Sequence, residues 1–369
     1  MNPLCFKSIK LGENQYAFYK RMPINNAQTF AAINLVKTIL LIGVVAIHSN
    51  TLNFTHSATE SLIEISDLIR YPLSFCVPLF FIISGFLFFL NVDRFNSVVY
   101  RKKIKSRIVT LLIPYLLWNT VAGIIRFLKA KYLGYDGDGI YVNGEFSLIG
   151  FLCGYWDTGN TYPMLFNLWF IRNLIIFQIL SPIFYFIARN KYLTLAVLLI
   201  SVCDIDLYGG EFFLLGCVMG INKYNFNLNR LYCLALFPVV IIASYGILFI
   251  NIPTVNFQPI LCYVLIILII PIAGLPVNKS HNIRNALNHN SHIIFFIYVI
   301  HGMYSNLITR FCASIIPAHS LIGILSGSLI SVILNISLSY VIFLLLNRIS
   351  PRLIKLLTGS RSSTPNYLR

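Results

Sequence analysis

The sequence predicts an all-α polytopic membrane protein, a bundle of about ten transmembrane helices. Apolar residues make up 57% of the 369 residues and charged residues only 11%, and the mean hydropathy is +0.76. Soluble domains carry about 25% charged residues. Continuous apolar runs, most of them close to the ~20 residues that cross a bilayer core, recur from end to end. Because lipid offers no partner to backbone polar groups, each run is expected to be helical.

Ten such runs define the expected spans, which are residues 32–51, 71–91, 108–127, 165–187, 192–207, 210–221, 231–250, 259–276, 292–310 and 320–346. The fifth and sixth runs are short, so they form either two crossings or one broken hairpin. The chain accordingly divides into a cytoplasmic N-terminal segment at 1–31, a transmembrane domain at 32–346 and a basic cytoplasmic tail at 347–369.

The distribution of basic residues predicts the topology. With a cytoplasmic N-terminus and ten alternating spans, 21 of the 28 Lys and Arg residues fall in cytoplasmic segments. This is the positive-inside asymmetry, and shifting the topology by one span would remove it. Both termini are therefore expected in the cytoplasm. The net charge of +16 is explained by topology, so no nucleic-acid partner is needed.

Ionisable residues within spans are costly and are functional candidates by default. Lys37 and His48 lie eleven residues apart in the first span. This spacing places both on one helix face, about 16 Å apart along the axis. Lys37 could instead be a snorkelling lysine at the inner boundary, and His48 could be an interfacial histidine bonded to a neighbour.

Two further candidates lie in later spans. His301 falls in the middle of the ninth span, where it either lines a cavity or forms a helix–helix hydrogen bond. Arg172 follows Trp169 in the fourth span, and its guanidinium suits planar anionic groups. The alternative for Arg172 is a structural ion pair with an acidic residue such as Glu211.

A basic cluster in the cytoplasmic segment after the second span could seat a phosphate-bearing cofactor or simply anchor the topology; it comprises Arg101, Lys102, Lys103, Lys105 and Arg107. The eight cysteines are scattered without a CxxC pair, so no metal site or disulfide framework is expected. The residues alone leave transporter, polymerase and transferase open.

Four stretches of the chain carry a resemblance to a known family, and a fifth, at 105–114, also fits. Lys37 and His48 match a basic residue, ten residues and then His on a first helix, with Lys where most members have Arg. The other stretches are PLFFIISGFL at 78–87, LWFIR at 168–172 followed by Ser-Pro at 181–182, FFIYVIH at 295–301 and KSRIVTLLIP at 105–114. In this order, from about residue 32 to 346, the chain resembles the acyltransferase family 3 integral membrane proteins, which include bacterial polysaccharide O-acetyltransferases.

The resemblance implies an O-acyltransferase of the bacterial inner membrane. The implied donor is cytoplasmic acetyl-CoA, which is a substrate and not a permanently bound cofactor. The implied acceptor is a sugar hydroxyl of an exported or lipid-linked glycan, such as a lipopolysaccharide O-antigen. The partners are thus acetyl-CoA, the glycan and the bilayer, and the oligomeric state stays open.

The resemblance also suggests roles for the candidate residues. His48, on the outer side, would be the general base that activates the acceptor hydroxyl, with His301 as the second catalytic candidate. Lys37 and Arg172 would hold groups of the donor, and the basic cluster would face its phosphates. Ser84 could be proposed as a nucleophile, but a packing role beside Gly85 is favoured, since small residues let helices approach closely.

Two rival functions belong to other classes. A glycan polymerase or flippase would also have many helices, and the hydrophilic outer loop near 128–164 could serve it. Such proteins would lack the Lys37–His48 spacing and the Ser84-Gly85 stretch. A solute transporter would show inverted repeats and paired broken helices, and the sequence shows neither.

Overall fold

The computed structural model describes residues 24–54, 59–135, 139–159, 161–203, 207–250, 256–289, 291–316 and 320–359. Most of the predicted N-terminal segment and the last ten residues of the predicted tail lie outside these ranges. The expected cytoplasmic position of both termini therefore stays a prediction.

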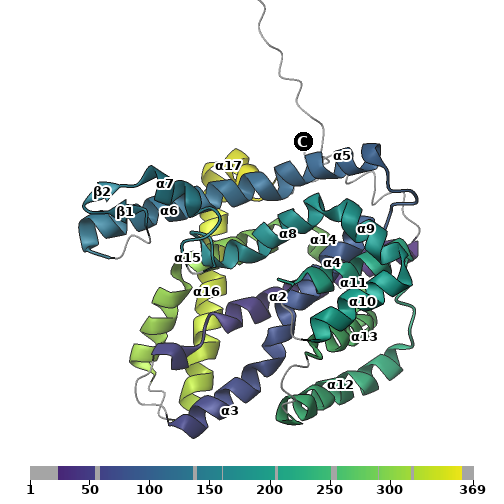
Figure 1. The fold of residues 1–369 in the computed structure, drawn as a ribbon. Helices are drawn as coiled ribbons and strands as arrows, with labels where there is room; N and C mark the ends of the chain where they lie inside the picture. Colours follow the sequence, from purple (N-terminus) through teal and green to yellow (C-terminus); the bar gives the residue numbers. More distant parts are fainter. Residues whose placement is uncertain are drawn as a thin grey trace, which may run out of the picture.

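The described chain is almost entirely helical (Figure 1). Its α-helices are α2 Ile24–Ile47, α3 Glu60–Arg70, α4 Cys76–Phe89, α5 Ser97–Arg107, α6 Ile113–Leu133, α7 Leu148–Cys153, α8 Trp169–Ile179, α9 Ser181–Arg189, α10 Lys191–Val202, α11 Gly210–Ile221, α12 Arg230–Ile250, α13 Gln258–Lys279, α14 His281–His289, α15 Ser291–Ile315, α16 Leu321–Ile349 and α17 Pro351–Leu357. Short turns of helix are η1 Thr51–Phe54, η2 Tyr71–Phe75, the π-turn η3 Ile108–Leu112 and η4 Phe166–Leu168. The strands β1 Tyr141–Val142 and β2 Glu145–Phe146 form one antiparallel hairpin.

The all-α polytopic fold is confirmed. Within the described residues, seven helices are long and apolar enough to cross a membrane, or eight if one bent pair counts as a span. Several of them expose large apolar side chains, as α12 does at Leu231, Ile242 and Phe249, which are 73%, 69% and 71% exposed. Such surfaces suit contact with lipid rather than with water.

The other expected spans are shorter or broken. The fourth is the bent pair α8 and α9, whose axes differ by 68°. The bend falls at Ser181-Pro182, where proline lacks an N–H and disfavours helix in the residue before it. The fifth and sixth are α10 and α11, with 12 residues each. At ~1.5 Å per residue, 12 residues reach about 18 Å and do not span a bilayer core.

Close packing of α4 on α11 explains the small residues of the 78–87 stretch. Gly85 faces the backbone of α11 at Phe213, and Gly216 of α11 faces the Ile82 carbonyl, so neither position has room for a side chain. The Ser84 hydroxyl donates to the Phe80 carbonyl of its own helix at 2.7 Å. Helices α4 and α11 therefore pack through small residues, as many pairs of membrane helices do.

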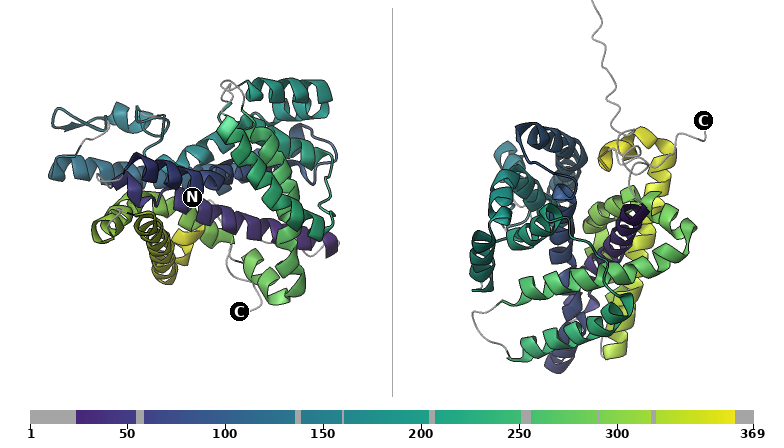
Figure 2. Two further views of the ribbon diagram at one scale, coloured as in Figure 1. Left: turned by 90° about the horizontal axis from the view of Figure 1, so that it is seen from below. Right: turned by 90° about the vertical axis from the view of Figure 1, so that its right-hand side faces the viewer.

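Helix α2 runs through the middle of the bundle, where it contacts α4, α13, α15 and α16 (Figures 1 and 2). Helices α5 and α6 join through η3 into a nearly continuous rod along one side, with the β-hairpin and α7 beside its end (Figure 1). The start of the predicted tail packs one side of α17 against the bundle. In α17, Ile354 and Leu357 are buried, and the Trp118 indole of α6 donates to the Leu357 carbonyl at 3.0 Å.

Candidate active site

His48 lies in the turn that directly follows the last residue of α2, Ile47. A helix end leaves carbonyls without intrahelical partners, and here other elements supply them. The Arg70 guanidinium donates to the Ile47 carbonyl at 2.7 Å. The Thr309 hydroxyl lies 3.4 Å from the His48 carbonyl and shares its proton between that carbonyl and the Ser305 carbonyl of its own helix, at 2.8 Å. A cation at a helix C-terminus is also favourable to the helix dipole. The backbone at His48 is thus fixed from α3 and α15.

A seam of buried polar residues anchors the rest of this turn to α15 and α16. Asn335 donates to the Ser49 hydroxyl at 3.3 Å, and the Thr51 hydroxyl donates to the Ile324 carbonyl at 3.1 Å. Thr309 and Ser331 share a hydrogen bond of 2.9 Å between their hydroxyls. Each such bond between membrane helices contributes on average about 0.6 kcal/mol, so the seam positions the turn collectively.

His301 lies on α15 beside His48. The centroids of the two imidazole rings are 5.6 Å apart, and His301 is fully buried while His48 is half-buried. The His301 Nδ1 lies 3.1 Å from the Ile297 carbonyl, which can only accept, so Nδ1 carries the proton. The Nε2 atom of a neutral His301 then holds a lone pair, and it has no hydrogen-bond partner among the described residues.

A third element of the site, beside the end of α2 and α15, is η4, which lies at the start of the bent pair α8 and α9. The Asn167 amide donates to the carbonyls of Tyr298 and Val299 at 2.6 and 3.2 Å, and the Tyr298 hydroxyl donates back to the Asn167 carbonyl. Gly302 leaves room for the Asn167 side chain where a Cβ would collide with it. This docking places the Phe166 ring edge-on to His48, with centroids 4.9 Å apart.

Sequence reasoning missed Arg70, Phe166 and Asn167 as parts of this site. Arg70 lies just outside the expected spans, because the acidic residues of α3 interrupt the apolar pattern before it. Asn167 carries a signal that could have found it: a polar side chain inside a long apolar run. Nothing in the sequence points to Phe166, whose position depends on the docking of η4.

Lys37 does not join the two histidines. It lies eleven residues before His48 on α2, which corresponds to about 16 Å along the helix axis. Its side chain is half-buried in the middle of the bundle. At this distance Lys37 and His48 cannot contact the same group of a ligand.

Arg172 is held by the loop that precedes α8 instead of the Glu211 carboxylate considered above. Within the described chain its guanidinium donates to the carbonyls of Trp156 and Thr161, the latter at 3.2 Å, and lies 5.1 Å from the Trp156 ring centroid. The neighbouring Trp169 packs against Phe81, with ring centroids 6.3 Å apart. Arg172 thus connects α8 to the loop that precedes it.

The predicted basic cluster lies on helix α5 and divides between two faces. Lys103 donates to the Phe88 carbonyl of α4, and its ammonium lies 4.7 Å from the Phe88 ring centroid. Arg107 also lies over this ring, at 5.8 Å. Lys103 and Arg107 therefore dock α5 on α4, whereas three exposed cations remain available to a ligand: Arg101, Lys102 and Lys105.

Among the described residues, no three His, Cys, Asp or Glu side chains gather as a metal site would require. The expectation that the protein uses no metal stays a prediction.

The fold and the paired histidines define a multi-pass membrane protein with a buried polar site, and a comparison with known families identifies the class. The family model described as an acyltransferase domain, acyltransferase family 3, matches residues 30–344. The chain therefore belongs to this family and is an acyltransferase. No curated protein and no solved structure matches the chain.

Proposed function

We propose that this membrane acyltransferase moves an acetyl group from acetyl-CoA to a sugar hydroxyl of a surface polysaccharide or its lipid-linked precursor, in the bacterial inner membrane. Membership of the acyltransferase family favours this reaction over the polymerase, flippase and transporter alternatives. The observation that carries the proposal is the pairing of His48 with His301, because acyl transfer to a hydroxyl needs a base and an imidazole suits that task at neutral pH.

The two histidines suit different roles in such a reaction. His48 is half-buried and can meet an acceptor, whereas His301 is fully enclosed. His48 would take the proton of the acceptor hydroxyl as its oxygen attacks the thioester carbonyl. The C–S bond then breaks, and the CoA thiolate leaves with the proton returned from the His48 imidazolium. His301 would act as a positioning residue whose Nε2 lone pair can accept a hydrogen bond from the His48 N–H.

Direct transfer fits the surroundings of Ser84 better than an acyl-enzyme. A nucleophilic serine needs a base within hydrogen-bond reach. The Ser84 hydroxyl instead donates to the Phe80 carbonyl, and Gly85 beside it packs on α11. Ser84 is therefore assigned to packing, with no covalent intermediate on this residue.

The donor side of the proposal rests on charge. The phosphates of acetyl-CoA need cationic partners, and the exposed face of α5 offers Arg101, Lys102 and Lys105. Lys37, half-buried on α2, is proposed to hold a polar group of the donor nearer the thioester. Arg172 is proposed to keep the outer loop closed over the site.

A labelling experiment tests the donor, the acceptor and the bond formed. Membranes with and without the protein are incubated with [¹⁴C]acetyl-CoA and the host polysaccharide or its lipid-linked precursor. The proposal predicts label in the glycan only when the protein is present, released by mild base as an ester of oxygen. Label that resists base, or equal label in both membranes, would contradict the proposal.

A further inference from the structure

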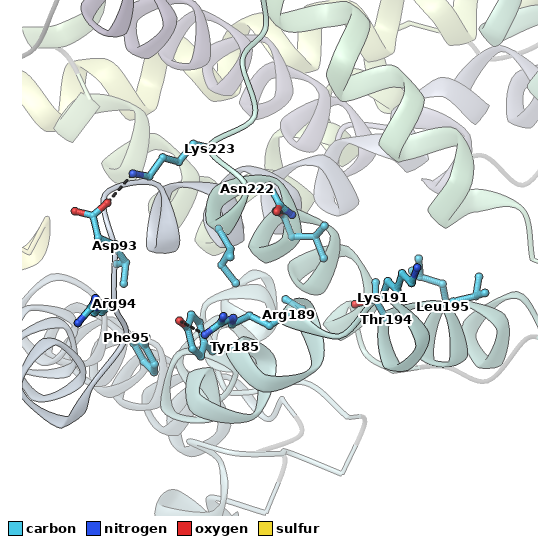
Figure 3. Close-up of a pocket in the computed structure, with 15 residues that line it drawn as sticks. Asp93, Arg94, Phe95, Tyr185, Arg189, Lys191, Thr194, Leu195, Asn222 and Lys223 are labelled. Atoms are coloured by element: carbon cyan, nitrogen blue, oxygen red, sulfur yellow. Dashed lines mark hydrogen bonds and ion pairs between the residues drawn. The ribbon is translucent and has the colours of Figure 1, made fainter.

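A cleft of about 1070 Å³ lies apart from the paired histidines, where the α4–α5 connection meets the α9–α10 corner and the end of α11 (Figure 3). This volume is slightly above the range of about 300–1,000 Å³ typical of sites for small molecules and cofactors, so a large ligand would fit. None of the residues that line it belongs to the site around His48. The charged residues that line it all lie in segments that the basic-residue pattern places in the cytoplasm.

The cleft carries an excess of positive charge. Four of its lining residues are cations, namely Arg94, Arg189, Lys191 and Lys223, and all four are exposed. Asp93 is the one carboxylate among the described residues that line the cleft. Its partner is Lys223, whose ammonium lies 2.6 Å away and holds the pKa of Asp93 below its usual value. Three cations thus remain without a counter-charge in the cleft, which suits a polyanion.

Aromatic rings lie between the charged walls. Figure 3 shows Asp93, Arg94 and Phe95 on one side and Lys191 on the other, with Tyr185 and Arg189 between them. The rings of Phe95 and Tyr185 have centroids 5.1 Å apart, and the Arg189 guanidinium lies 5.6 Å from the Tyr185 centroid. Arginine beside aromatic rings suits a ligand that combines phosphates with a flat base. The guanidinium can bind a phosphate bidentately, and an aromatic ring can stack on the base.

Lys223 occupies a backbone conformation that favours glycine. It follows the end of α11 with φ at +49°, and the next residue closes the helix by donating from the Tyr224 N–H to the Met219 carbonyl at 2.9 Å. Glycine or asparagine is usual at such a position. A lysine here keeps a cation at the cleft despite the less favourable backbone. Replacement by glycine should consequently remove the charge without unfolding the helix end.

We propose that this cleft binds the phosphate-bearing nucleotide end of the CoA donor. The inference rests on the proposed function, and it adds the cations of the cleft to those of the adjoining α5 as partners of the donor phosphates. Because these contacts are remote from the reacting carbon, they hold donor and transition state equally. Weakening them should raise KM for acetyl-CoA and leave kcat unchanged.

The binding of [³H]CoA to the purified full-length protein in detergent tests the cleft directly. Arg189→Gln combined with Lys191→Gln should raise the Kd for CoA about tenfold, and Lys223→Gly about threefold, as expected for exposed charge–phosphate contacts. Asp93→Asn should lower the Kd, since it releases Lys223 for the ligand. The matched control is Arg352→Gln, an exposed basic residue of α17 outside the cleft, which should change nothing.

The same preparation separates the possible failures. If the wild type binds CoA and the cleft variants bind it equally well, the cleft is not the site, and the proposed function stands. Phosphatidylglycerol in mixed micelles could displace CoA from the wild type, and the cleft variants could lose the binding of this lipid. That result would make the cleft a lipid headgroup site and overturn the inference. If the wild type neither binds CoA nor transfers from acetyl-CoA, the proposed function fails, and this inference with it.

Discussion

The imidazole rings of His48 and His301 lie 5.6 Å apart, although one follows the first long helix and the other lies on α15 near the opposite end of the chain. The buried ring is fixed by its own helix through Ile297, and the half-buried ring is fixed through its backbone by Arg70 and Thr309. General-base catalysis needs a base whose position is fixed, and these contacts fix the backbone that carries His48.

Removing the His301 ring should reduce turnover without weakening substrate binding. His301→Ala is expected to lower kcat about 10- to 100-fold with little change in KM, because a lost positioning contact affects the transition state more than the ground state. His301→Gln, which can place an acceptor near the Nε2 position, should recover part of kcat. The matched control is His292→Ala, which removes a buried histidine ring that packs on Phe343 of α16. Equal losses in the two alanine variants would mean that the effect is structural.

The docking of η4 on α15 should show coupled behaviour between Asn167 and Gly302. Asn167→Ala removes two hydrogen bonds to buried carbonyls and should cost about 1–3 kcal/mol, together with much of the transfer activity. Gly302→Ala should destabilise the protein similarly, because its Cβ collides with the Asn167 side chain. The double variant should be more stable than the sum of the single changes predicts, since the alanine at 167 leaves room for the new methyl group. Additive losses in thermal melting would contradict this contact.

Arg70 should stabilise the end of α2 next to His48. Arg70→Ala leaves the Ile47 carbonyl without its partner and should lower the free energy of unfolding by about 1–3 kcal/mol. Arg70→Lys should lose less of the free energy of unfolding, because lysine keeps the positive charge and can still donate a hydrogen bond. Thermal melting followed by fluorescence size-exclusion measures the effect, with the exposed Arg230→Ala as control. If Arg70→Ala melts like the control, the carbonyl contact does not hold this turn.

The close approach of α4 and α11 should make Gly85 intolerant of a single methyl group. Gly85→Ala directs its Cβ at the Phe213 carbonyl, and overpacking of this kind costs about 1–3 kcal/mol. Gly246→Ala on α12 is the matched control, because a Cβ there meets open space. A lower melting temperature for the first variant and an unchanged or higher one for the second would support the packing. The same melting temperature for both would contradict it.

The sequence predicted the helices well because lipid imposes a simple rule. Each of the ten apolar runs contains or overlaps a helix, since an apolar run in a bilayer must satisfy its own backbone. It was harder to predict which runs cross the membrane fully. Pro182 bends the fourth span, and the lengths of α10 and α11 depend on the turns that bound them. Helix α3 was missed because Glu60, Glu64 and Asp67 interrupt the apolar pattern.

The candidate site was only partly predictable for a different reason. Ionisable side chains are costly inside a membrane and are therefore rare there. This rule pointed to His48 and to His301 separately, without relating the two. Their proximity depends on how α15 packs against the end of α2, which no local pattern encodes. Among the described residues, two of the three hydrogen-bond partners of Arg172 are main-chain carbonyls of the loop before α8, and the residue types of a sequence do not indicate which main-chain carbonyls accept a hydrogen bond.

The role of His48 as the base is the central claim, and one comparison tests it most directly. The rate of transfer from labelled acetyl-CoA to the glycan is measured for wild type and His48→Ala in membranes at matched expression, with binding of CoA measured alongside. A positioned base contributes typically 10²–10⁴-fold, so His48→Ala should bind CoA normally and transfer at least about 100-fold more slowly. Transfer at the wild-type rate by His48→Ala would remove His48 from the reaction and contradict the account.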